Sequence, residues 1–286
     1  LSFNDDFDPI KSELVFLALP HGVSHNYINK YYKKIKIIDL SADFRLDSLS
    51  TYKKNYNVDH SCPELLEKFI YGLPEINQSE LINNNNISVP GCYPTSILLP
   101  LIPLIKNDLI KSDNIIIDSK SGYSGAGKKF DKANIENDKD YNFYNYKTNS
   151  HQHICEIHQE LQKYSKNLVK FSFNPHILPN FRGIMSTIYC DLNKDITIPE
   201  IKKELAKFYN KMPFILLLNE DKKADFFEVQ YTNNCLIKIF DHQSDDKIIL
   251  VSLIDNLIKG AAGQAIQCFN LSMNFDENLS LTNLNE

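Results

Sequence analysis

The amino-acid sequence predicts an α/β protein whose first part is a doubly wound parallel sheet. Two short, unbroken apolar runs, at residues 14–19 and 35–40, are typical of strands that are buried on both faces. Residues 25–34 between them have the pattern of a helix, and a strand–helix–strand order joins parallel neighbours. A third strand is expected at 86–89, ahead of Pro90 and Gly91.

Ligands of a doubly wound sheet bind beyond the carboxyl ends of its strands. Three short segments follow the predicted strands at this edge, namely His21-Gly22, residues 41–45 and Gly91-Cys92. The sequence therefore places its first candidate functional residues in these segments.

The second half of the chain predicts a mixed or antiparallel sheet with helices. Strands are expected at 114–119, 168–173, 183–192, 235–240 and 247–253, and helices at 94–107, 199–210 and 253–269. Pro100 and Pro103 predict a kink or an early end in the first of these helices. The last helix carries an apolar stripe, and Gly260 and Gly263 would let it pack closely on a sheet. The polar, tyrosine-rich segment 131–149 is expected to be a long loop.

Composition and charge exclude several classes of protein. The 286 residues suffice for one large domain or two ordinary ones, and a net charge of −5 gives no electrostatic case for a nucleic-acid or anionic-membrane partner. No apolar run approaches about 20 residues, the length of a transmembrane helix. The acidic first residues resemble neither a secretory signal nor a transit peptide. Six scattered cysteines without a C-x-x-C pair indicate free thiols in a reducing, cytoplasmic compartment.

Cys92 is the strongest candidate for a catalytic residue. It follows a strand and Pro90-Gly91, and it precedes the helix expected from Pro94. The N–H groups and the dipole at a helix N-terminus stabilise a thiolate, which is the nucleophilic form of cysteine. A buried structural role is the usual alternative for a free cysteine, and it is the expectation for the other five.

His151 and His153 precede a helix with apolar residues at helical spacing, which Asn149 or Ser150 could cap. The helix dipole would lower the pKa of a histidine there, so that the ring stays neutral and can act as a base. The H-x-H pair could instead bind a metal, but further ligands at a suitable spacing are missing and no metal site is expected. Two ordinary histidines are the third interpretation.

Residues 122–128 contain three of the nine glycines of the chain and follow a predicted strand. They nearly match the phosphate-binding pattern G-x-x-x-x-G-K-[ST], but Lys129 stands where a hydroxyl would bind magnesium. A glycine loop whose backbone N–H groups face some anion is the favoured alternative.

The sequence contains only two arginines, Arg45 and Arg182, but 29 lysines. Lysine can serve most surface positions, whereas only arginine offers a planar fork for a carboxylate or a phosphate. Each arginine is therefore a candidate for substrate binding, with an ordinary surface position as the alternative.

Taken together, these segments resemble the N-acetyl-γ-glutamyl-phosphate reductase family of arginine biosynthesis. The matching stretches, in the order of the family, are LALPHGVS (17–24), IIDLSADFRL (37–46), YGLPEI (71–76), PGCYPTS (90–96), IIDSKSGYSGAGK (116–128), HQHICEI (151–157), FNPHILPNFRGI (173–184) and KGAAGQAIQ (259–267). The resemblance implies a partial Rossmann-type NADP-binding domain at 1–91, completed by a C-terminal helix at 253–286. It also implies an α+β catalytic and dimerisation domain of the semialdehyde-dehydrogenase type at 92–252.

The activity implied by the resemblance is an NADPH-dependent reductive dephosphorylation of N-acetyl-L-glutamyl 5-phosphate to the 5-semialdehyde, by a homo-oligomer (a dimer or a tetramer). Cys92 would attack the acyl phosphate to form a thioester, hydride from NADPH would reduce it, and His153 would transfer protons. The residues implied in substrate binding are Arg45, Arg182 and His151. The residues implied in binding NADP(H) are His21, Gly22, Ser121, Gly122, Ser124, Gly125 and Gly127.

One departure from the family pattern concerns the cofactor. The family begins with a strand and a G-x-x-G-x-x-G turn that binds the pyrophosphate, and this sequence has no such motif. Because the first strand here resembles a later strand of that domain, we expect a truncated chain with weak or absent NADPH binding and, as a result, poor activity. The alternatives are a non-catalytic subunit that binds substrate, a reductase similar to aspartate-semialdehyde dehydrogenase, and a thiol hydrolase that uses Cys92 and His153.

Overall fold

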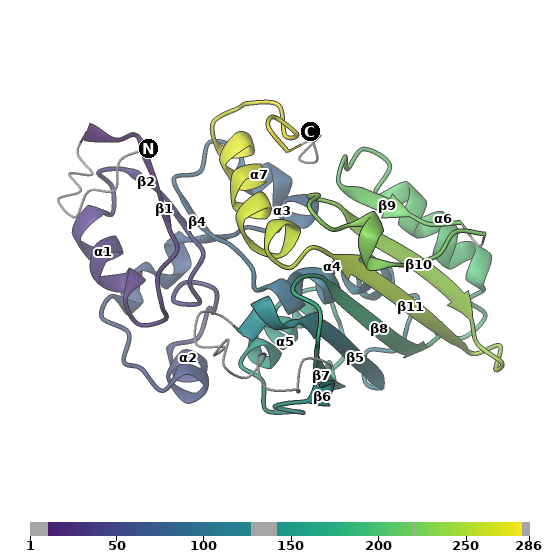
Figure 1. Cartoon of the computed structure of the whole chain (residues 1–286). Helices are drawn as coiled ribbons and strands as arrows, with labels where there is room; N and C mark the ends of the chain where they lie inside the picture. The colour runs from purple at the N-terminus through teal and green to yellow at the C-terminus, as the bar shows by residue number, and fades with distance from the viewer. Residues whose placement is uncertain (1–10, 127–141, 220, 282–286) are drawn as a thin grey trace. The chain divides into compact units, whose positions relative to one another are not determined.

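The computed structural model describes residues 11–126, 142–219 and 221–281. The chain forms two compact units, which are described separately (Figure 1). The first unit comprises Leu1–Pro90 and Gln264–Leu279, and the second comprises Gly91–Gly263 and Ser280–Glu286.

The first unit contains a four-stranded parallel sheet in the order β1-β2-β4-β3, as the sequence predicts for a doubly wound fold. Its strands are β1 (Leu14–Leu17), β2 (Lys36–Asp39), β3 (Ile70–Tyr71) and β4 (Asn86–Ser88). Its helices are α1 (Ser24–Tyr31), α2 (Leu49–Tyr56), α3 (Pro74–Leu81) and α7 (Gly263–Ser272), with a 3₁₀ helix at Pro63–Lys68.

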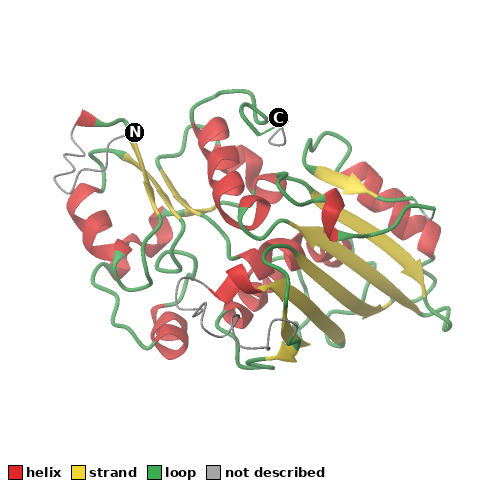
Figure 2. Ribbon diagram, viewed as in Figure 1, coloured by secondary structure: helices red, strands yellow, loops and turns green. Residues whose placement is uncertain are grey.

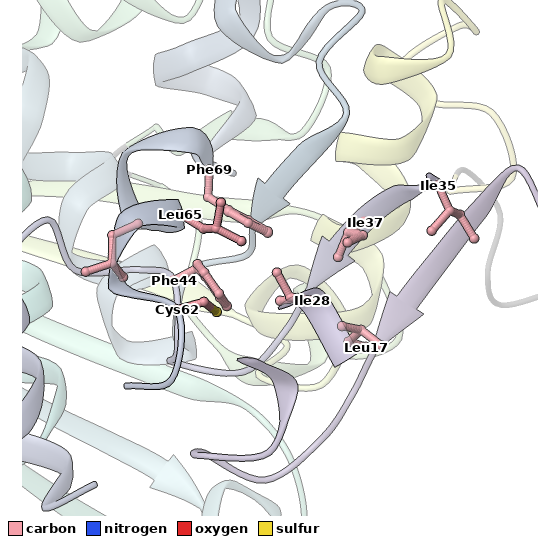
Figure 3. Close-up of a cluster of buried hydrophobic side chains, with 9 residues drawn as sticks. Leu17, Ile28, Ile35, Ile37, Phe44, Cys62, Leu65 and Phe69 are labelled. Atoms are coloured by element: carbon pink, nitrogen blue, oxygen red, sulfur yellow. The ribbon is translucent and has the colours of Figure 1, made fainter. Parts of the chain in front are cut away.

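Helices cover both faces of this sheet because successive residues of a strand point to opposite sides. Ile37 of β2 packs with Ile28 of α1 in one apolar cluster (Figure 3). The next residue, Ile38, packs on the other face with Ala265 and Cys268 of α7. Two continuous cores therefore hold the strands, and the strand ends remain at the edge where the candidate residues of this unit lie.

The second unit is built on a seven-stranded mixed sheet in the order β6-β7-β5-β8-β11-β10-β9 (Figure 2). Its strands are β5 (Ile115–Gly122), β6 (Tyr144–Asn145), β7 (Phe171–Leu178), β8 (Ile184–Asp191), β9 (Ile215–Leu217), β10 (Cys235–Asp241) and β11 (Lys247–Ile254). β5 and β7 are parallel, as are β9 and β10, and the other neighbouring pairs are antiparallel. The predicted mixed sheet is confirmed.

Helices cover one face of the large sheet. α4 (Cys92–Lys106) packs against β8 and β11, with α5 (His153–Gln162) and α6 (Ile198–Phe208) beside it. The strands alternate accordingly, since Ile115 and Ile117 of β5 are buried while Ile116 between them is 48% exposed. Tyr189 and Phe240 are exposed in the same way, so the face opposite the helices keeps apolar side chains at its surface.

The predicted early end of the helix after Cys92 is wrong, because α4 runs through both prolines to Lys106. Pro103 has no N–H to donate to the carbonyl of Leu99, one turn earlier. The buried hydroxyl of Tyr209 donates to that carbonyl instead. The apolar, buried length of α4 and this substitute hydrogen bond keep the helix intact.

The predicted final helix at 253–269 is also partly wrong. Leu253 and Ile254 belong to β11, where they pair with Met185 and Ile184 of β8. A π-helix at Ile258–Ala262 follows, and α7 begins only at Gly263. An apolar run alone does not separate a buried strand from a helix, and here the pairing partners decided.

None of the helices within the described residues combines the length and the apolar character needed to cross a membrane.

Candidate active site

Cys92 is the first residue of α4, and extended Gly91 (φ −67°, ψ 157°) caps the helix ahead of it. The helix thus begins two residues earlier than predicted and places the thiol within its first turn. The N-terminal dipole and amide groups of α4 favour the thiolate of Cys92. Burial has the opposite effect elsewhere, since it raises the pKa of the Cys62 and Cys155 thiols to about 11.

His153 lies against the residue that precedes Cys92. A Cβ atom added at Gly91 would be 2.6 Å from Nε2 of His153, and one added at Gly260 would be 2.8 Å from Cβ of Cys92. Real Cβ atoms do not approach other atoms so closely, so only glycine at 91 and 260 permits this packing. The first turn of α4, which carries the Cys92 thiol, is therefore flanked by the His153 ring and by the backbone of the π-helix at Gly260.

Gln152 is the N-cap of α5 and makes no capping hydrogen bond with its side chain, whereas the sequence predicts Asn149 or Ser150 as the cap. Nδ1 of His151 accepts the backbone N–H of His153 at 3.0 Å. The Asn149 side chain is used elsewhere, because its Oδ1 accepts the N–H of Phe173 at 2.8 Å. The expected Asn or Ser cap is wrong, and the first N–H of the helix is bonded to the ring of His151, the residue before the N-cap.

A buried hydrogen-bond network surrounds His151. Nε2 of His151 lies 3.4 Å from the Tyr146 hydroxyl, which donates to the Tyr93 hydroxyl at 3.3 Å. Because Nδ1 is an acceptor, the neutral ring carries its proton on Nε2. Burial, and secondarily Lys147, lowers the pKa of His151 to about 4. The lowered pKa agrees with the predicted neutral ring, and burial is its largest cause.

The first three N–H groups of the glycine segment, those of residues 122–124, are bonded to carbonyls of the protein and do not face an anion. Those of Gly122, Tyr123 and Ser124 donate to the carbonyls of residues 183, 180 and 181 at 2.8–3.0 Å. β5 continues through Gly122, and a 3₁₀ turn, not an α-helix, follows at Tyr123–Ala126. The anion-loop expectation is therefore wrong for these residues, whereas Gly127 lies outside the described residues.

Arg182 is held inside the second unit. Its Nη1 lies 3.2 Å from Oδ2 of the buried Asp255, and its guanidinium stacks over Tyr231 at 4.3 Å from the ring centroid. Its side chain is 15% exposed, so it is neither an ordinary surface residue nor an open cationic patch. The neighbouring Asn256 accepts the Gly183 N–H at 2.7 Å and donates to the Ser124 hydroxyl at 3.0 Å.

In the first unit, the segments after β1 and β2 come together as predicted. Gly22 (φ +80°) donates its N–H to both carboxylate oxygens of Asp43, at 2.8 and 3.1 Å. The N–H of Ala42 donates to Nδ1 of His21 at 3.2 Å. Arg45 is buried and donates to the Leu40 carbonyl at 2.7 Å. Burial, with Arg45 as a second cause, lowers the pKa of His21.

Three carboxylates that contact the predicted site residues are not singled out by the sequence. Asp43 binds the Gly22 turn, Asp255 binds Arg182, and Glu156 accepts the Gly91 N–H at 2.9 Å. Their only sequence signal is proximity to a predicted site residue, as in H-x-H-x-x-E at 151–156. The described residues contain no group of three or more His, Cys, Asp or Glu that could hold a metal ion.

Comparison with known proteins gives two family matches. Residues 1–84 match the semialdehyde dehydrogenase NAD binding domain, and residues 92–256 match the semialdehyde dehydrogenase dimerisation domain. The chain is 42% identical to N-acetyl-gamma-glutamyl-phosphate reductase of Ehrlichia canis over 281 residues, which is 98% of this chain and 81% of the relative. It is 45% identical to that of Caldicellulosiruptor bescii, over 96% of this chain and 80% of the relative.

Among solved structures, the fold is similar to aspartate semialdehyde dehydrogenase II from Vibrio cholerae. The TM-score is 0.69 at 17% sequence identity, over 94% of this chain and 82% of that chain. Aspartate semialdehyde dehydrogenase from Francisella tularensis gives a TM-score of 0.66 at 14% identity, over 91% and 81% of the two chains. At these identities the likeness shows the fold alone, and the fold agrees with the predicted class.

Proposed function

The chain belongs to the N-acetyl-γ-glutamyl-phosphate reductase family, and we propose that it converts N-acetyl-L-glutamyl 5-phosphate to N-acetyl-L-glutamate 5-semialdehyde and phosphate with NADPH. One observation carries the proposal. Cys92 begins α4, and the ring of His153 from α5 lies against Gly91, the residue before Cys92. A nucleophile and an acid–base group are therefore close to the same short segment.

Cys92 acts as the nucleophile. Its sulfur attacks the carbonyl carbon of the acyl phosphate, a C–S bond forms, and the C–O bond to phosphate breaks. An acyl phosphate is already activated, so a thiolate suffices. Backbone N–H groups in the first turn of α4 stabilise the negative charge that develops on the carbonyl oxygen.

NADPH, when bound, supplies the hydride that reduces the thioester carbon. His153 donates a proton to the oxygen of the resulting thiohemiacetal and takes it back as the C–S bond breaks and the aldehyde leaves. The two ring nitrogens of His151 face the His153 N–H and the Tyr146 hydroxyl. His151 therefore contributes to substrate binding by orienting these two neighbours.

The first unit fits one part of a dinucleotide site. A parallel sheet with helices on both faces has the Gly22 turn after its first strand, and the φ of +80° at Gly22 lies in the left-handed region that favours glycine. The proposed contacts to NADP(H) come from His21, Gly22, Ser121, Gly122, Ser124, Gly125 and Gly127. Those from residues 122–124 would not use the backbone N–H groups, because these are bonded to carbonyls of the protein.

Arg45 and Arg182 are the proposed ligands of the phosphate and carboxylate groups of the substrate. Arg45 is buried and Arg182 is partly buried, and each is anchored by one guanidinium nitrogen, Arg45 to the Leu40 carbonyl and Arg182 to Asp255. Anchoring orients the planar fork in advance, so that less side-chain entropy is lost when the substrate binds.

We propose a homo-oligomer in which a second copy covers the open face of the large sheet. The match to a dimerisation domain at 92–256 supports an oligomer. The exposed Ile116, Tyr189 and Phe240 supply apolar area on the face opposite α4, α5 and α6.

The test is the reverse reaction, with N-acetylglutamate semialdehyde, phosphate and NADP⁺, followed by the absorbance of NADPH. Because the sequence lacks the G-x-x-G-x-x-G turn, we expect weak activity in the chain and its loss in Cys92→Ser, with Cys155→Ser as the matched control that keeps the activity of the parent. Phosphate release from the acyl phosphate without use of NADPH would favour a thiol hydrolase. Activity that survives in Cys92→Ser would refute the proposed nucleophile.

A further inference from the structure

Glu156 is a buried carboxylate that the mechanism above does not use. We propose that Glu156 is a positioning residue, which fixes the turn that carries Cys92 relative to His153. The inference rests on the proposed function of these two residues, and it concerns only the second unit.

The geometry links Glu156 to both catalytic residues through Gly91. Glu156 lies three residues after His153 in α5, so the two side chains share a face of the helix. Oε1 of Glu156 accepts the N–H of Gly91 at 2.9 Å, and both groups are buried. The ring of His153 packs on the same glycine, 2.6 Å from the place of a Cβ. α5 therefore contacts Gly91 at two points, one polar and one steric.

Burial makes the hydrogen bond between Glu156 and Gly91 important. The side chain of Glu156 is fully buried, and a buried polar group is costly unless hydrogen bonds compensate. The bond thus restricts Gly91, and the next residue along the chain is Cys92. A misplacement of about 1 Å can cost a reaction about 100-fold in rate.

Glu160 offers a matched control on the same helix. It lies one turn further along α5, it is also buried, and it accepts hydrogen bonds from Lys163 and Gln159 at 2.8 Å. Glu156, and not Glu160, accepts the Gly91 N–H. Removing Glu160 measures the general effect of losing a buried carboxylate from α5.

The experiment compares Glu156→Ala, Glu156→Gln and Glu160→Ala in the full chain. Steady-state kcat and KM are measured in the reverse reaction, and thermal unfolding is followed for each protein. The rate of Cys92 alkylation by iodoacetamide is measured against pH, with mass spectrometry of the Cys92 peptide. The alkylation needs neither substrate nor cofactor, so it reports on Glu156 even if the reductase activity fails.

We expect Glu156→Ala to lower kcat about 10- to 100-fold, as losses of supporting hydrogen bonds around a site do. KM should stay within about threefold, because the ground-state contacts of the substrate are unchanged. The midpoint of Cys92 alkylation should shift from that of the parent, since the turn that carries the thiol is no longer fixed beside the His153 ring. Glu156→Gln keeps an acceptor oxygen for the Gly91 N–H and should restore both kcat and the midpoint.

Three results would overturn the proposal. In the first, Glu156→Ala keeps the kcat and the alkylation profile of the parent. In the second, Glu160→Ala shifts the profile as much as Glu156→Ala does. In the third, Glu156→Gln is as impaired as Glu156→Ala, which would deny the role of the acceptor oxygen. An inactive parent chain with a shifted alkylation profile in Glu156→Ala would count against the proposed function and for the positioning role.

Discussion

At the scale of single residues, the site depends on side chains whose protonation is set by burial. His151 is the clearest case, because its ring is 7% exposed and its pKa is lowered to about 4. Both ring nitrogens serve neighbours within the protein, so protonation would break the bond to the His153 N–H. The neutral ring is therefore part of the folded structure around Cys92.

This pKa predicts a loss of stability in acid. In the unfolded chain His151 titrates near its ordinary pKa of 6.5, so the unfolded state binds more protons between about pH 6.5 and 4. Its contribution is present above pH 6.5 and is lost as the pH falls through that window. The free energy of unfolding should fall by about 2 kcal/mol from pH 7 to 5 through this group.

Urea unfolding at pH 7 and pH 5 measures the effect. In His151→Asn, the amide oxygen still accepts the His153 N–H but does not titrate, so this part of the acid loss should disappear. His158→Asn, within α5, which begins two residues after His151, is the control. An equal acid loss in the parent and in His151→Asn would contradict the assignment.

At the scale of elements, α4 shows how a helix survives two internal prolines. The Leu99 carbonyl, which Pro103 leaves without a helical partner, accepts a hydrogen bond from the Tyr209 hydroxyl. A buried carbonyl without any partner costs about 1–3 kcal/mol. Because α4 carries Cys92 at its first residue, this bond also supports the site.

A double-mutant cycle tests this account. Tyr209→Phe should destabilise the protein by about 1–3 kcal/mol, since the carbonyl loses its donor. In a Pro103→Ala background, residue 103 regains an N–H that can donate to Leu99, so the same substitution should cost less. Chemical denaturation of the four proteins gives the coupling free energy, and additivity would show that the hydroxyl does not replace the missing N–H.

At the scale of the whole molecule, one face of the large sheet carries no helix among the described residues. Ile116 is 48%, Phe240 39% and Tyr189 38% exposed there, while the opposite face is packed under α4, α5 and α6. Large exposed apolar surfaces typically mark interfaces. The second copy proposed above would bury them.

Substitution of this face should weaken the oligomer. Tyr189→Lys places a charge among apolar side chains and should shift the protein toward monomer in sedimentation-velocity runs at micromolar concentration. Leu168→Lys is the control, because Leu168 is 61% exposed but lies in the loop before β7. An unchanged sedimentation profile in Tyr189→Lys would place the interface elsewhere.

The sequence by itself determined the parallel sheet of the first unit, the mixed sheet of the second and the candidate role of Cys92. These features depend on local pattern, since strand runs and a cysteine ahead of a proline-opened helix are visible within about ten residues. The family resemblance also rested on such short segments, and the relatives at 42–45% identity confirm it.

Only the tertiary structure decided the rest. The length of α4 depends on Tyr209, the end of β11 depends on β8, and the loop after β5 depends on the carbonyls of 180–183. Glu156 meets Gly91 across 65 residues of chain, and no spacing rule connects them. The physical reason is the same in each case. A buried polar group forms its hydrogen bond, and an apolar run packs or pairs, with whichever partner the fold brings next to it.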